Sequence, residues 1–135
     1  MKEKLFTAAV QGRGFAYAPY SKCLIGAALV TNQGKIYSGC NVENASYGGT
    51  VCAERVAIWK AASEGKNLQV AEICVVSDAE KAWPPCGLCR QVLAEFSTPA
   101  TLVHVANLKG IQKTYKFADL LPEAFGPAFL LPTNG

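Results

Sequence analysis

The chain has 135 residues, half of them hydrophobic, and carries a formal net charge of +3. This length suits one domain built around one core, and no apolar run approaches the roughly 20 residues of a membrane-spanning helix. The 13 Lys and Arg residues are scattered along the chain, which gives no basic track for a nucleic acid. We therefore expect one domain over residues 1–135 that binds neither membranes nor nucleic acids.

The first third of the chain predicts one helix and two strands. Apolar residues at spacings of three and four favour a helix over residues 2–12. Residues 24–30 form a continuous apolar run, which is typical of a strand buried on both faces. The turn Asn32-Gln33-Gly34 then leads into a returning strand over residues 35–40.

Helices and strands alternate in the middle of the chain. After a polar loop over residues 41–50, the sequence predicts a helix over residues 51–64 and a β-rich apolar strand over residues 70–77. The loop over residues 78–85 ends in two prolines, which oppose regular structure. A further helix is expected over residues 86–96.

The last part of the chain predicts two strands, over residues 101–106 and 111–115, with a turn at residues 107–110 between them and a short helical piece at residues 119–121. Strands joined through helices are expected to lie parallel and adjacent in one sheet. We therefore expect an α/β domain, a three-layer α/β/α sandwich with a mixed five-stranded sheet.

Three cysteines and one glutamate have the arrangement of a catalytic zinc site. Cys86 and Cys89 are spaced i, i+3 at the start of a predicted helix, so both thiolates can bind one ion, and Cys52 is the candidate for a third ligand. Three protein ligands leave one tetrahedral position open for water, whose pKa the zinc lowers. Glu54 can reach that water as a proton acceptor without binding the metal.

The cysteine content also bears on the compartment. Six cysteines would suit disulfides in a secreted protein, but residues 1–5 lack the apolar region of a signal peptide. We therefore expect a cytoplasmic protein with reduced thiols, in which Cys40 and Cys74 are core residues. His104, the single histidine, is expected to be a hydrogen-bonded core or surface residue.

Cys52-Ala53-Glu54 and Pro85-Cys86-Gly87-Leu88-Cys89 match the signature of the zinc deaminases. Beyond that core, the chain resembles the small homotetrameric cytidine deaminases over nearly its whole length. The segments that carry the resemblance stand in the family's order: Tyr17-Ala18-Pro19-Tyr20-Ser21, Gly26-Ala27-Ala28-Leu29, Asn41-Val42-Glu43-Asn44-Ala45, Cys52-Ala53-Glu54-Arg55, Cys89-Arg90-Gln91-Val92, and Leu120-Leu121-Pro122 with Phe125-Gly126-Pro127.

This resemblance implies an activity and a metal site. The expected reaction is hydrolysis of cytidine and 2′-deoxycytidine to uridine and 2′-deoxyuridine plus ammonia, in pyrimidine salvage. It uses one Zn²⁺ per chain, held by Cys52, Cys86 and Cys89, with Glu54 as the catalytic proton shuttle. The family places an arginine at the position of Arg55 as a donor to the thiolates, which offsets their surplus negative charge on zinc.

The substrate pocket is predicted from the segment before the first cysteine of the motif. Asn41 and Glu43 alternate with Val42, so their side chains point the same way in extended chain and together suit a hydroxyl group. A turn or a strand-end cap is the alternative role for these residues. The resemblance assigns them to the ribose 3′-hydroxyl, and it implies further substrate contacts from Val42, Ala53 and the Pro84 carbonyl.

The resemblance also implies a homotetramer whose active sites are shared between chains. Tyr47 and Phe125 are the candidates for residues that a neighbouring chain contributes. Two positions depart from the family pattern: Cys23 stands where many relatives have an aromatic residue, and Pro84 stands where many have Ser.

Other interpretations stay open at the level of sequence. A deaminase of a cytosine-nucleoside antibiotic or a modified nucleoside would use the same residues. A redox dithiol is suggested by Trp83 before the Cys-x-x-Cys pair, but it leaves Glu54 and Cys52 without a role. A structural zinc module would need a fourth ligand, for which the candidates are Cys23, Cys40, Cys74 and His104.

Overall fold

A computed structural model describes residues 1–132 of the chain. Its helices and strands follow in the order α1 (Lys2–Arg13), β1 (Gly26–Thr31), β2 (Ile36–Cys40), η1 (Tyr47–Gly49), α2 (Ala53–Glu64), β3 (Val70–Ser77), α3 (Gly87–Phe96), β4 (Ser97–Asn107), β5 (Gly110–Lys116), α4 (Phe117–Leu120) and η2 (Pro127–Phe129). None of the helices in residues 1–132 has the length and apolar character needed to cross a membrane.

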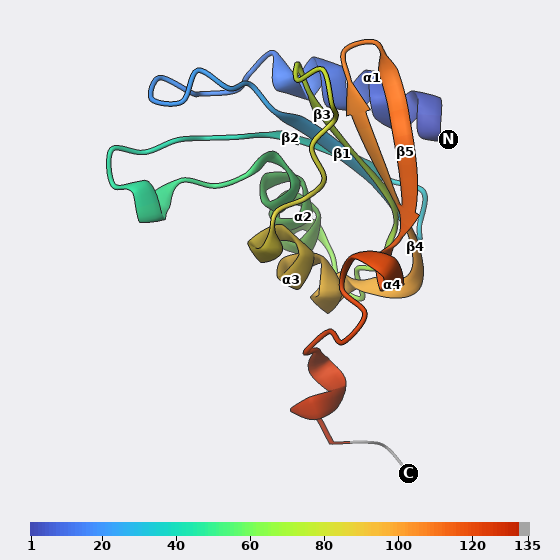
Figure 1. Ribbon diagram of the computed structural model, residues 1–135. Coiled ribbons are helices and arrows are strands. Elements are labelled where there is room, and N and C mark those ends of the chain that lie inside the picture. The colour runs from blue at the N-terminus through green and yellow to red at the C-terminus, as the bar shows by residue number, and fades with distance from the viewer. Residues whose placement is uncertain (133–135) are drawn as a thin grey trace.

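The five strands form one mixed sheet in the order β2-β1-β3-β4-β5. Only β3 and β4 pair in parallel, and the other neighbours are antiparallel. Helix α1 packs on one face of this sheet, and α2 and α3 pack on the other (Figure 1). The predicted α/β/α layers and mixed five-stranded sheet are therefore confirmed.

One expected strand pairing is wrong. Strands joined through a helix were expected to be parallel neighbours, which holds for β3 and β4. Strands β2 and β3 are also joined through a helix, but β1 lies between them and pairs antiparallel with both. The tight hairpin from β1 to β2 occupies one edge of β1, so the chain returns through α2 to its other edge.

The helices that carry the cysteine motif begin slightly later than predicted. Cys52 and Cys86 are the N-cap residues of α2 and α3, each with extended backbone, so the helices start at Ala53 and Gly87. Each thiol therefore lies at the positive end of a helix dipole, where a thiolate is stabilised.

Two strand boundaries also differ from the prediction. Strand β1 begins at Gly26, because the Leu24 carbonyl and the Ile25 N–H bond to side chains instead of a neighbouring strand. Strand β4 begins at Ser97, which makes it longer than the predicted residues 101–106.

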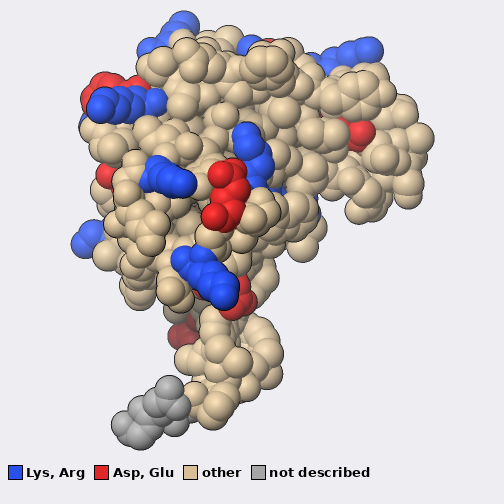
Figure 2. Space-filling model, turned by 180° about the vertical axis from the view of Figure 1, so that it is seen from behind, with Lys and Arg blue, Asp and Glu red and all other residues tan. Residues whose placement is uncertain are grey.

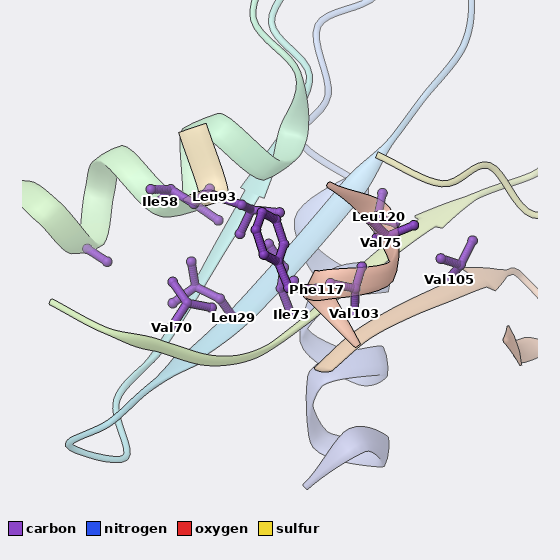
Figure 3. Packing of buried hydrophobic residues seen from close by; sticks show 12 residues of the cluster. Leu29, Ile58, Val70, Ile73, Val75, Leu93, Val103, Val105, Phe117 and Leu120 are labelled. Atoms are coloured by element: carbon purple, nitrogen blue, oxygen red, sulfur yellow. The ribbon is translucent and has the colours of Figure 1, made fainter. Parts of the chain in front are cut away.

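Each face of the sheet buries its own apolar cluster. The cluster beneath α2 and α3 joins residues from strands and helices, including Leu29, Ile58, Ile73 and Leu93 (Figure 3). The cluster beneath α1 contains Leu5 and the strand residues that point the opposite way. This burial on both sides explains why the residues of β1 are all buried.

Gly39 in β2 sets how closely α2 approaches the sheet. A Cβ at this position would lie 2.5 Å from the Ala53 carbonyl oxygen and 2.6 Å from the Ala57 nitrogen. Both distances are too short for a side chain, so only glycine lets the first turn of α2 rest on β2. The contact fixes the part of α2 that follows Cys52.

The surface carries mixed charges and a projecting C-terminal segment. On the face shown in Figure 2, Lys and Arg side chains are interspersed with Asp and Glu over a mainly uncharged surface. Beyond α4, the chain extends away from the sheet and its helices (Figure 1). This segment exposes Phe125, Phe129, Leu130 and Leu131.

Candidate active site

The three motif cysteines meet where α2 and α3 begin. The sulfur atoms of Cys52, Cys86 and Cys89 all lie within 4.8 Å of one another, and those of Cys52 and Cys86 are 3.7 Å apart. Cys89 is buried in the first turn of α3, whereas Cys86 is exposed and Cys52 is partly exposed. The cluster is therefore enclosed by protein at Cys89 and exposed to solvent at Cys86.

The spacing of the thiols fits a tetrahedral metal ion. With Zn–S bonds of about 2.3 Å, two thiolates on one zinc are separated by about 3.8 Å, close to the separation of Cys52 and Cys86. Among the residues that the structure describes, the cluster contains only these three potential ligands. The donor set is thus the open, three-ligand kind found in catalytic zinc sites.

Hydrogen bonds hold Cys52 ready to act as a thiolate. The Cys89 thiol and the Arg55 guanidinium both interact with its sulfur, and the pKa of Cys52 is lowered to about 5. The Arg55 nitrogen lies 3.4 Å from that sulfur. The hydrogen bond between Cys89 and Cys52, together with burial, raises the pKa of Cys89.

Glu54 follows Cys52 in the first turn of α2 and is almost completely enclosed. Its side chain is 4 % exposed, and burial raises its pKa to about 7. A carboxyl group with this pKa can both accept and donate a proton near neutral pH.

A pocket of about 240 Å³ opens beside the thiols. Its wall contains Glu54, Cys52 and Cys86, which places a proton carrier and two potential metal ligands around one volume. The remaining lining residues come from three loops, the start of α2 and the second half of β3: Ile25, Asn41, Glu43, Thr50, Val51, Ala53, Val75, Ser77, Trp83 and Pro84.

Asn41 and Glu43 face this pocket together, and each is held by the loop before β1. The Asn41 amide donates to the Cys23 carbonyl at 2.7 Å and accepts from the Ile25 N–H at 2.9 Å. Glu43 accepts from the Ser21 hydroxyl and from the Tyr20 and Ser21 N–H groups at 3.0 and 3.1 Å. Both polar groups are therefore fixed before any ligand binds.

Comparison with known proteins agrees with this geometry. Residues 1–105 match the family model described as the cytidine and deoxycytidylate deaminase zinc-binding region. The chain belongs to the cytidine and deoxycytidylate deaminase family. The resemblance read from the sequence motifs is confirmed by this match.

Individual members of the family are similar over nearly their whole length. The cytidine deaminase of Halalkalibacterium halodurans is 47 % identical, with 92 % of this chain and 93 % of that protein covered. The one from Sporosarcina psychrophila is 48 % identical over 91 % of this chain and 90 % of its own. The crystal structure of cytidine deaminase from Burkholderia pseudomallei superimposes with a TM-score of 0.86 at 45 % identity, covering 93 % of this chain and 99 % of that one.

Most, but not all, of the residues predicted from the deaminase resemblance line the pocket. Val42 does not line it, and its backbone pairs with Val51. Arg55 lies behind Cys52, with its guanidinium 5.9 Å from the ring centre of Trp59. Tyr47 and Phe125 are 77 % and 54 % exposed and do not line the pocket of their own chain.

The candidates for a fourth metal ligand lie outside the cluster within residues 1–132. His104 is buried between strands, where its ring nitrogens lie 2.8 Å from Thr114 Oγ1 and 2.8 Å from Glu72 Oε1. Cys74 is buried in the core, and burial raises its pKa to about 12. Cys40 is partly exposed rather than fully buried.

Sequence reasoning missed several residues of the pocket. Ser77 and Trp83 both line it, and Ser77 Oγ is buried with no hydrogen-bond partner in residues 1–132. Ser21 belongs to a segment that carries the family resemblance, but the sequence does not indicate that its hydroxyl and N–H hold Glu43. The position of Ser77 at the end of a buried strand was the one available signal, since such ends commonly border sites in α/β folds.

Proposed function

We propose that this chain is a zinc-dependent enzyme that hydrolyses cytidine and 2′-deoxycytidine to uridine and 2′-deoxyuridine, with release of ammonia. Its single catalytic domain over residues 1–135 would serve pyrimidine salvage in the cytoplasm. The observation that carries the proposal is the buried carboxyl group of Glu54, which shares one pocket with the open face of the cysteine cluster. Membership of the deaminase family supports the same activity.

The three cysteines would hold one Zn²⁺ per chain. When bound, zinc supplies the acidification of water that makes a nucleophile available near neutral pH. Three thiolates on a divalent cation leave a surplus of about one negative charge. Arg55, at 3.4 Å from Cys52, and the positive ends of α2 and α3 offset that surplus.

Glu54 would carry the proton through the reaction. Its carboxylate accepts one proton as the oxygen of water adds to C4 of the base, and it passes this proton to the ring nitrogen. It then takes the remaining proton from the C4 hydroxyl and passes it to the amine. The bond between C4 and the exocyclic nitrogen then breaks, ammonia leaves, and a carbonyl group remains at C4. The pKa of about 7 lets one group perform both transfers.

Asn41 and Glu43 would bind the sugar. Asn41 gives one N–H of its amide to Cys23, so the second N–H is available to a hydroxyl oxygen. Glu43 accepts three hydrogen bonds from residues 20 and 21, which leaves one acceptor position of its carboxylate for a hydroxyl hydrogen. Ala53 and the Pro84 carbonyl would contact the base, with the carbonyl accepting from the amine, and Val42 is proposed as a further substrate contact.

The active site would be completed by neighbouring chains in a homotetramer. Within residues 1–132, the pocket of the single chain is lined by one aromatic residue, Trp83. Tyr47 and Phe125 are exposed on segments that project from the body of the chain (Figure 1). We propose that each roofs a site in a neighbouring chain.

One comparison of substrates tests the proposed function. Cytidine, 2′-deoxycytidine, 3′-deoxycytidine and free cytosine are each incubated with the zinc-loaded protein, and the loss of cytosine-type absorbance is followed. We expect the first two to react well and the last two poorly, because a site built to bind a hydroxyl group rejects analogues that lack it. Equal rates on cytidine and free cytosine would remove the sugar-binding role of Asn41 and Glu43.

A further inference from the structure

The loop that joins β3 to α3 is held in place mainly by side chains. Residues 79–84 bring Trp83 and Pro84 to the pocket. Within residues 1–132, their backbone forms no hydrogen bond to another backbone group. The position of this wall of the pocket therefore depends on the side chains that reach the loop.

Two amide side chains, one from β4 and one from β5, converge on this loop. Asn107, which ends β4, donates from Nδ2 to the Glu80 carbonyl at 3.1 Å. Gln112, on β5, donates from Nε2 to the same carbonyl at 3.2 Å and accepts from the Ala82 N–H at 2.9 Å. These three hydrogen bonds are named here the Glu80 clamp.

The geometry of the clamp suits a positioning role. The Glu80 carbonyl has two lone pairs, and each binds one amide N–H. Gln112 bonds a donor and an acceptor two residues apart, as a neighbouring strand would. Asn107 is itself fixed, because it is buried and its Oδ1 accepts from the Lys109 N–H at 2.9 Å.

Other contacts anchor the end of the loop separately from the clamp. Arg90 donates from Nε to the Pro85 carbonyl at 2.8 Å and from a terminal nitrogen to the Leu120 carbonyl at 3.0 Å. This contact lies next to Cys86, so the metal ligand is held by α3 and Arg90. A change in the clamp should therefore move Trp83 and Pro84 without displacing the cysteine cluster.

We propose that Asn107 and Gln112 are positioning residues that set the wall formed by Trp83 and Pro84, and thereby the fit of the pocket to the base. The effect on catalysis rests on the proposed function, but the position of Trp83 does not. Neither residue touches the pocket, so both act only through the loop.

The test uses Trp83 as a reporter. The chain has two tryptophans, and Trp59→Phe removes the other while leaving an aromatic ring beside Arg55. In this background, Gln112→Met removes both bonds of Gln112, Gln112→Glu keeps the acceptor for Ala82, and Asn107→Asp keeps the bond to Lys109 but loses the donor to Glu80. Gln33→Met, in the exposed β1–β2 turn, is the matched control.

Four measurements are made on each zinc-loaded protein: zinc content, acrylamide quenching of Trp83 fluorescence, and KM and kcat for cytidine. We expect Gln112→Met and Asn107→Asp to keep their zinc, to increase quenching, and to lower kcat/KM about tenfold, mainly through KM. A displacement of about 1 Å can cost about 100-fold. Gln112→Glu should have a smaller effect, and Gln33→Met none.

Two outcomes separate the clamp from the proposed function. If Trp83 quenching in Gln112→Met and Asn107→Asp equals that of the background protein, the clamp does not position the loop and the inference is wrong. If quenching changes but the background protein deaminates no cytidine, the clamp stands and the proposed function fails.

Discussion

Arg55 donates to the sulfur of Cys52 at 3.4 Å, from one turn further along the same helix. The guanidinium group also lies over Trp59, which keeps it directed toward the start of α2. A positive charge is thus built into the cysteine cluster by a residue that does not line the pocket.

The first prediction concerns this charge. Arg55→Gln should lower zinc affinity or kcat by about 10- to 100-fold, the usual cost of removing a group that bonds to a metal ligand. Zinc titration with a chelator and steady-state kinetics measure the two effects. Arg55→Lys keeps the charge but lacks the planar guanidinium group, so its zinc affinity and kcat should lie between those of the wild type and those of Arg55→Gln. Wild-type values for Arg55→Gln would show that the helix ends alone compensate the thiolates.

The second prediction concerns the metal ligands. Alanine at Cys52, Cys86 or Cys89 should abolish stoichiometric zinc binding, because two thiolates do not hold the ion in a three-ligand site. Elemental analysis should find one zinc per wild-type chain. Cys23→Ala, a thiol outside the cluster, serves as the control and should keep its zinc. Retention of full zinc after loss of Cys86 would refute the ligand set.

The third prediction concerns the proton carrier. Glu54→Gln has nearly the same shape but cannot transfer protons, so kcat should fall by a factor on the order of 10²–10⁴. Zinc content should stay unchanged, since Glu54 is not among the metal-binding atoms. The matched control is Glu64→Gln at the exposed end of the same helix, which should behave as wild type. Normal turnover in Glu54→Gln would place the proton chemistry on another group.

The fourth prediction concerns the pH dependence of sugar binding. The Ser21 hydroxyl and N–H, with the Tyr20 N–H, hold the pKa of Glu43 below its ordinary value. A lowered folded-state pKa means that the carboxylate and its hydrogen bonds are fully present above the ordinary pKa of about 4.3. They are lost only as the pH falls through the lower, folded-state value.

Binding of uridine to the Glu54→Gln protein isolates this effect from the titration of Glu54. We expect the titration of Glu43 to leave the dissociation constant unchanged between about pH 5 and 7, because the ordinary and the folded-state pKa of this carboxyl group both lie below that range. Ser21→Ala should raise the pKa of Glu43. As the pH is lowered, uridine binding should therefore weaken at a higher pH in this variant than in the protein that keeps Ser21. An identical pH profile with and without the Ser21 hydroxyl would contradict the proposed role.

The fifth prediction concerns shared active sites. Phe125→Ala and Glu54→Gln proteins should each have little activity alone. Mixed after dissociation and reassembly, they should recover part of it, because a site with an intact Glu54 can receive Phe125 from the Glu54→Gln chain. Light scattering should show the homotetramer. An active monomer at nanomolar concentration would refute the sharing.

The sequence predicted the cysteine cluster from two short spacings and one motif. Cys86 and Cys89 are one helical turn apart, and Glu54 lies two residues after Cys52. Cys52 and Cys86 are 34 residues apart, so only the zinc deaminase signature predicted that they meet. The alternation of Asn41 and Glu43 likewise predicted that they face one volume, and both line the pocket. The order of strands was harder, because nothing in the sequence states that β1 lies between β2 and β3.

The parts of the site that sequence reasoning missed depend on long-range contacts. Asn107 and Gln112 reach the loop before α3 only because β4 pairs with β3 and β5 pairs with β4. The support of Glu43 by Ser21 crosses from the loop before β1. Such partners are separated by more than 20 residues and have no motif of their own, so only the folded chain brings them into view.

Gly39 has a consequence for how this enzyme can change during evolution. Because backbone meets backbone where β2 supports α2, almost any mutation there would displace Cys52 and Glu54 together, and selection has little freedom to adjust that wall. The opposite wall of the pocket, formed by Trp83 and Pro84, is held by the amide side chains of Asn107 and Gln112. We expect that these two residues can be substituted without displacing the cysteines. New substrate preferences should therefore arise by substitutions in residues 79–84 and in the strands that hold them, while the chemistry of the other wall is inherited unchanged.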